Sequence, residues 1–127
     1  MNFTRLEIPD VILCEPKTLS DDRGYFSETF RQDKLEEFLG FSINFCQENE
    51  SKSSFGVLRG LHYDDKTWKL ISCPHGKLYL VVLDLRPKQP NYGKWESFIL
   101  SPETSTQVLV PPMFANGHYV FEDDSIF

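Results

Sequence analysis

The 127-residue chain has a net charge of −6, 14% aromatic residues and only three cysteines. This length allows one domain with a real hydrophobic core and is too short for two. The acidic balance excludes a general nucleic-acid binder, but it still allows a small cluster of cations that holds an anionic ligand inside a pocket.

The cysteines, Cys14, Cys46 and Cys73, show neither CxxC spacing nor paired histidines nearby, so we predict neither a disulfide framework nor a bound metal. The sequence contains no signal-peptide pattern and no apolar run near the ~20 residues of a membrane helix. We therefore expect a cytoplasmic protein with no membrane partner and no nucleic-acid partner.

Short apolar and aromatic segments between Pro, Gly and Asn breaks indicate strands along most of the chain. The exception is residues 31–40, where Leu35, Phe38 and Leu39 share one face and Gly40 suits a C-terminal cap, so this segment predicts a helix. Residues 21–30 combine turn chemistry at Asp22 and Gly24 with a short aromatic strand. In chain order, strands are expected within residues 6–16, 21–30, 42–53, 77–86, 95–101 and 106–112.

The segment 77–86 is apolar almost throughout, which predicts a central strand without a wet face. Residues 87–95 indicate a turn, and the strand at 106–112 ends on prolines that a strand interior does not tolerate. Strands at turn intervals of ~8 to 12 residues favour an all-β jelly roll or a related barrel with one short helix.

The interior of such a barrel holds one small ligand, contacted by side chains at alternate strand positions. Gln47 and Asn49 share one face of their expected strand, and Arg59, His62 and Lys69 follow. These cations, amides and one imidazole suit a phosphate-bearing ligand with a proton to move. Local sequence alone leaves a second interpretation open, in which the histidine is structural and the two cations are solvated surface charges.

Longer motifs extend this pattern along nearly the whole chain. They are "DDRGYFSETF", "FCQENESKSSFGVLRGLHY", "KLISCPHGK", "LDLR", "YGKWESFILS" and "PPMFANGH". In this order they resemble the cupin-fold nucleoside-diphosphate 4-keto-sugar 3,5-epimerases, the family of dTDP-4-dehydrorhamnose 3,5-epimerase. The resemblance implies a cupin-type jelly-roll barrel, no cofactor, and a nucleoside-diphosphate 4-keto sugar, a 6-deoxyhexose or a heptose, as substrate.

The resemblance also implies residue roles. His62 matches the base that removes a proton beside the C4 ketone, and Lys69 matches the lysine near the enolate oxygen. Arg23 and Arg59 match diphosphate-binding arginines, whose forked donors suit phosphate oxygens. The family forms dimers with shared active sites, so we expect a homodimer. The further positions implied to contact nucleotide or sugar are Phe26, Glu28, Gln47, Asn49, Asn116 and His118.

The chain departs from the family pattern at several points. Asp64 replaces a common Gln, Leu80 replaces a common Asp, and "FANGH" places Asn116 and His118 where the family has His and Phe. The family's acid, a tyrosine, is expected just beyond Phe127. We therefore expect residues 1–127 to form a single cupin domain that lacks its C-terminal strands.

Three rival functions are considered. A metal-dependent cupin is disfavoured because "GLHYDD" offers only His62 where that class needs two histidines. A single-centre epimerase or a ketoisomerase needs the same base with a lost or displaced acid. A catalytically silent cupin that only binds the sugar nucleotide is the third.

Overall fold

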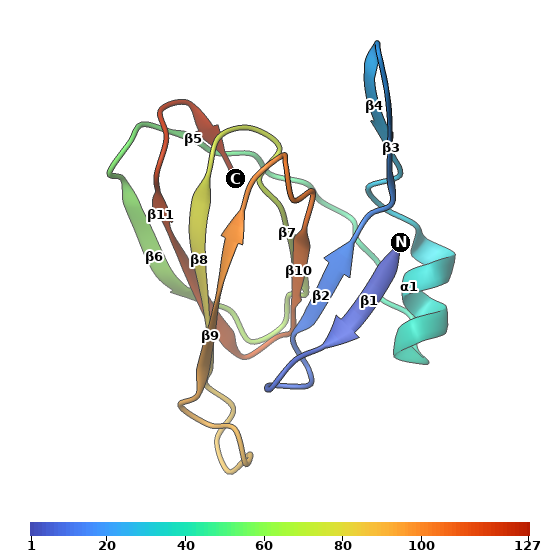
Figure 1. Ribbon diagram of the computed structural model, residues 1–127. Helices are drawn as coiled ribbons and strands as arrows, with labels where there is room; N and C mark the ends of the chain where they lie inside the picture. Colours follow the sequence, from blue (N-terminus) through green and yellow to red (C-terminus); the bar gives the residue numbers. More distant parts are fainter.

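The computed structural model describes all residues from 1 to 127, and antiparallel strands dominate it (Figure 1). The elements are β1 (Asn2–Arg5), β2 (Ile12–Glu15), β3 (Thr18–Asp21), β4 (Gly24–Ser27), α1 (Gln32–Leu39), β5 (Lys52–Ser53), β6 (Leu58–Tyr63), β7 (Lys69–Ile71), β8 (Leu78–Asp84), β9 (Trp95–Leu100), β10 (Gln107–Val110), β11 (Phe114–Val120) and β12 (Ser125–Ile126). No helix in the structure has the length and apolar character to cross a membrane.

Two four-stranded sheets form the barrel, in the orders β1-β2-β10-β7 and β6-β11-β8-β9. Two small sheets, β3-β4 and β12-β5, complete the strand pairing. A core cluster that includes Ile71, Leu80, Val108 and Phe114 fills the space between the large sheets. The predicted all-β jelly roll with one short helix is therefore confirmed.

The predicted central strand is β8, which pairs with β11 on one side and β9 on the other. Its burial alternates: Leu78, Leu80, Val82 and Asp84 are fully buried, whereas the residues between them are only half-buried. The central position is confirmed, but the continuous apolar run does not reflect full burial on both faces. Inward residues pack in the barrel, and outward residues line an open sheet face.

The predicted helix is α1, which ends at Gly40, where φ is 80° and the N–H donates to the Glu36 carbonyl over 2.8 Å. Its buried Leu35 packs with Ile12 and Leu109 on the outer face of the β1-β2-β10-β7 sheet. Every residue of β10 is consequently buried, because the barrel interior covers one face and the helix layer covers the other.

Two strand predictions were wrong in their bounds. Residues 6–16 contain a turn around Pro9, and the strands lie on either side of it, at β1 and β2. Most of the strand expected at 42–53 is also absent, since only Lys52 and Ser53 pair with a neighbour. A strand needs a ladder partner, and within this chain residues 42–50 have none.

The "LDLR" motif is structural. The Asp84 carboxylate is completely buried, and Arg86 binds it at 2.6 Å while also reaching Asp10 at 2.9 Å. The guanidinium of Arg86 stacks over the Phe114 ring with its central carbon 4.7 Å from the ring centroid. A buried carboxylate needs such a paired cation, and this one links the β1–β2 turn to the end of β8.

Candidate active site

The site is organised by the pairing of β6 with β11. Asn116 lies directly opposite His62, and His118 lies directly opposite Arg59. One residue separates Asn116 from His118 on β11, but two residues separate Arg59 from His62 on β6. The ladder therefore contains a bulge. In a regular strand a spacing of three would point Arg59 and His62 to opposite faces. The bulge brings them to the same face.

Two glycines make this bulge possible. Gly60 has φ of 114°, and a Cβ there would lie 2.7 Å from the Gly117 Cα and 2.9 Å from the Asn116 carbonyl oxygen. A Cβ on Gly117 would lie 2.9 Å from the Arg59 carbonyl oxygen. The two backbones therefore approach more closely than any side chain permits.

His62, Lys69 and Asn116 belong to the inner face of the barrel. Asn116 alternates with Phe114, a core residue, and its opposite neighbour His62 shares its face. Lys69 lies opposite Val110, which is also in the core. The Lys69 ammonium crosses between the sheets and donates to the Asn116 Oδ1 at 2.9 Å. The predicted base thus lies on the strand position opposite Asn116, and the predicted enolate-stabilising cation is hydrogen-bonded to the Asn116 side chain.

Arg59 and His118 form the second half of this cluster. The Arg59 Nε donates to the Ser53 Oγ over 3.0 Å, and His118 is only 4% exposed and stacks on Phe127 with ring centroids 4.2 Å apart. The His118 Nε2 is buried and has no hydrogen-bond partner. Burial lowers the pKa of His118 below its ordinary value, and the positive charges of Arg59 and His62 lower it further. A neutral imidazole with an open nitrogen therefore faces this cluster.

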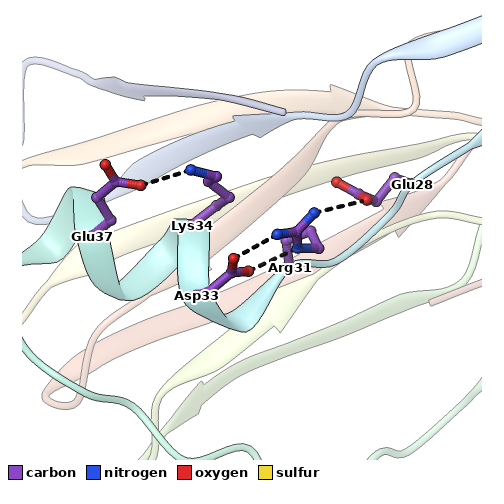
Figure 2. Close-up of polar contacts among 5 residues, drawn as sticks. All are labelled: Glu28, Arg31, Asp33, Lys34 and Glu37. Atoms are coloured by element: carbon purple, nitrogen blue, oxygen red, sulfur yellow. Dashed lines mark hydrogen bonds and ion pairs between the residues drawn. The ribbon is translucent and has the colours of Figure 1, made fainter.

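Three predicted site residues lie elsewhere in the chain. Arg23 and Phe26 belong to the β3–β4 hairpin, which projects away from the barrel (Figure 1). The Arg23 side chain is 90% exposed and pairs with Asp21, whose pKa it lowers by hydrogen bonding. Glu28 follows the hairpin and pairs with Arg31 at 3.4 Å beside the start of α1 (Figure 2).

Gln47 and Asn49 also lie apart from His62. Both are exposed in the unpaired segment before β5, and the Gln47 amide nitrogen donates to the Asn49 Oδ1 at 2.9 Å. Neither side chain has a hydrogen bond to a residue of the barrel. The structure therefore gathers His62, Lys69, Arg59, Asn116 and His118, and leaves the other five predicted residues outside.

The departures at Asp64 and Leu80 have structural explanations. The Asp64 Oδ1 accepts hydrogen bonds from the backbone N–H groups of Lys66 and Thr67, which shapes the β6–β7 turn and lowers the pKa of this carboxyl. Leu80 is fully buried in the core and lies opposite His118. The Asp64 carboxylate makes no hydrogen bond to His62.

Sequence reasoning missed Ser53, Gly60, Gly117 and Phe127. Ser53 and Phe127 become neighbours of the site only through long-range pairing. Gly60 and Gly117 carry a signal that the sequence does contain, because a glycine within a strand often marks a bulge or a close backbone approach. The sequence did not indicate that β6 and β11 are the two strands that pair at these glycines.

Comparison with known proteins identifies the family. The profile of the dTDP-4-dehydrorhamnose 3,5-epimerase family matches residues 5–127. The chain belongs to this family. The dTDP-4-dehydrorhamnose 3,5-epimerase of Escherichia coli (strain K12) is 42% identical over 130 residues, which cover 100% of this chain and 70% of that protein.

Solved structures of the epimerase family agree. A dTDP-6-deoxy-D-glucose-3,5-epimerase from Legionella pneumophila, in complex with dTDP-4-keto-L-rhamnose, superposes with a TM-score of 0.92 at 38% identity, covering 98% of this chain and 68% of that one. A 3'-monoepimerase from Streptomyces bikiniensis, in complex with dTDP-quinovose, gives a TM-score of 0.89 at 30% identity, covering 95% of this chain and 63% of that one. The predicted family, its cupin-type fold and its isomerase class are confirmed; the residue roles stay predictions.

The glycine contact can be tested by substitution. We expect Gly60→Ala to lower the free energy of unfolding, because its Cβ meets the backbone of β11. Gly93→Ala is the matched control, since Gly93 also has a positive φ, 79°, but nothing lies within 4 Å of an added Cβ. Chemical denaturation of both variants separates steric clash from backbone strain. Equal destabilisation would contradict a role for the close strand approach.

The burial of His118 predicts a pH dependence of stability. Its pKa is lower in the folded state than the ordinary value of 6.5, so the unfolded chain binds more protons below that pH. Stability from neutral His118 is therefore present above pH 6.5 and is lost as the pH falls towards the folded pKa. We expect His118→Phe to flatten the dependence of unfolding free energy on pH in this window, measured by denaturant titration. His75→Phe, at an exposed histidine, should keep the wild-type slope.

Proposed function

We propose that the protein is an epimerase that inverts C3 and C5 of a dTDP-linked 4-keto-6-deoxy sugar through an enolate, with His62 as the base. The observation that carries this proposal is that Asn116, on the inner face of the barrel, pairs with His62 across the strands and accepts a hydrogen bond from Lys69. The substrate class is the one named for the relatives that share the fold and much of the sequence.

The proposed chemistry needs three groups. A ketone at C4 acidifies the C–H bonds at C3 and C5, so the His62 imidazole takes the proton and the bonding pair moves to the C4 oxygen as an enolate. The Lys69 ammonium stabilises that developing negative charge. An acid then returns a proton to the opposite ring face, and inversion results.

The acid is not apparent among the strands around the site. Tyr79 and Tyr119 lie opposite one another on the outward face of their sheet, and both pack near Phe121. Neither phenol shares a face with His62.

We assign diphosphate binding to Arg59. We assign to the unpaired Nε2 of His118 a contact with the same ligand. Ser53 engages only the Nε of Arg59, so both terminal nitrogens of the guanidinium remain available for two parallel hydrogen bonds to phosphate oxygens. The His118 Nε2 is buried without a partner, and a ligand polar atom would satisfy it. We propose that Asn116 lies beside the sugar of the bound substrate.

We further propose a homodimer in which the β3–β4 hairpin of one subunit completes the site of the other. Leu19, Tyr25 and Phe26 are each more than half exposed on this hairpin. Exposed aromatic strands and an unpaired segment at 42–50 favour pairing with a second copy in a closed two-fold arrangement. Arg23, Phe26, Glu28, Gln47 and Asn49 would then serve the partner's site.

A single-centre epimerase is the second candidate. It is favoured by the likeness to the 3'-monoepimerase from Streptomyces bikiniensis and by the altered interior at Leu80, Asn116 and His118. Proton exchange in D₂O distinguishes the two, because a double epimerase labels C3 and C5 and a single one labels one carbon.

The role of His62 is tested by exchange. We expect His62→Asn to slow deuterium incorporation by ~10²- to 10⁴-fold while dTDP binding, measured by calorimetry, stays near wild type. His75→Asn is the matched control at a histidine outside the site and should exchange normally. Wild-type exchange in His62→Asn would refute the base; no exchange in the unaltered protein would favour a binding-only cupin.

Shared sites predict complementation between two inactive variants. In a dimer of His62→Asn with Phe26→Asp, one site carries both defects and the other carries neither. Random mixing makes half the dimers mixed, so we expect about a quarter of the sites to regain activity. The measurement is turnover after the subunits are mixed and re-equilibrated. Sedimentation as a monomer at micromolar concentration, or no recovery on mixing, would contradict the shared site.

A further inference from the structure

We propose that Asn116 is a positioning residue that fixes the Lys69 ammonium for enolate stabilisation, and that its neutrality is essential to this role. This inference rests on the proposed function, because it concerns how the cation of that site is held. It adds a role for Asn116 that differs from a contact with the substrate.

The first support is the way the two side chains meet. Lys69 comes from β7 in one sheet, and Asn116 comes from β11 in the other, so their 2.9 Å hydrogen bond bridges the two layers. A lysine ammonium sits at the end of a flexible stem with several rotatable bonds. Asn116 Oδ1 is its one hydrogen-bond acceptor in the chain, so this contact decides where the charge lies.

The second support is the rigidity of the anchor. Asn116 is 5% exposed and lies in a strand that is paired on both sides, opposite His62 in β6 and opposite Val82 in β8. The same residue therefore sets the backbone position next to the base and the location of the cation. A fixed distance between base and cation is what a positioned enolate requires.

The third support is the charge of the acceptor. An amide oxygen orients an ammonium without cancelling its charge, whereas a carboxylate would form an ion pair and weaken the field at the enolate oxygen. The Asp64 carboxylate accepts hydrogen bonds from the backbone N–H groups of Lys66 and Thr67, whereas Lys69 donates to Asn116. The ammonium is therefore held by a neutral acceptor.

These observations predict distinct effects for two substitutions of similar size. Asn116→Asp keeps an acceptor but adds a charge, and Asn116→Leu removes the acceptor. We expect both to slow deuterium exchange into the sugar, by up to about 100-fold as for a misplaced catalytic group, while dTDP affinity changes little. Gln107→Leu is the control and should leave exchange unchanged. Gln107 is also a buried amide, but it is adjacent in β10 to the core residue Val108 and therefore faces away from the barrel interior.

The deciding measurement is a double-mutant cycle with Lys69→Met. If Asn116 acts through Lys69, neither Asn116 substitution should slow exchange by more than about twofold once Lys69 has been replaced. A further large loss in the Lys69→Met background would overturn the proposal, and so would wild-type exchange in Asn116→Asp.

Failure of this inference is distinguishable from failure of the proposed function. The exchange measurement with His62→Asn tests the base independently of Asn116. Loss of exchange in His62→Asn together with normal exchange in Asn116→Asp would retain the epimerase and reject the positioning role. Thermal unfolding of each variant identifies any that lose activity by failing to fold, and Asn116→Asp serves if Asn116→Leu does so.

Discussion

The close approach of Gly60 to Gly117 determines which side chains share the barrel interior. Without the extra residue that the bulge accommodates, a regular β6 strand would present either His62 or Arg59 to the inside, but not both. The first carries the proposed proton transfer and the second the proposed diphosphate contact. Two glycines without side chains therefore connect the chemistry of the sugar with the anchoring of the nucleotide.

The site residues come from two kinds of strand, buried inner strands and an exposed edge strand. β11 and β8 lie inside their sheet and hold the buried Asn116 and His118 in fixed places. β6 is an edge strand whose residues are all exposed, so His62 and Arg59 remain open to a ligand. Functional groups at the rim of a packed scaffold combine access with fixed geometry.

Local patterns predicted the elements whose stability is local. The helix was readable from Leu35, Phe38 and the cap at Gly40, and β8 was readable from its apolar run. Residues 42–50 failed as a strand because ladder pairing depends on a neighbour that the segment's own composition does not reveal. For the same reason, the sequence identified His62 and Arg59 as candidates but could not show that a bulge joins them. The resemblance also implied site roles for Arg23 and Phe26, which the single chain places on the projecting β3–β4 hairpin and not in the barrel interior.

The charge of the interior differs from that of the whole molecule. The chain carries a net charge of −6, but the cations Arg59 and Lys69 lie on one side of the barrel. Two carboxylates also occupy inward positions: Arg86 neutralises Asp84, and Glu96 accepts a hydrogen bond from the Ile8 N–H at 2.7 Å. Leu80 stands opposite His118, and a carboxylate there would have given the imidazole a charged partner. With a leucine at this position and an amide at Asn116, neither residue neutralises Arg59 or Lys69, and these two cations suit a diphosphate and an enolate, the two anions of the proposed reaction.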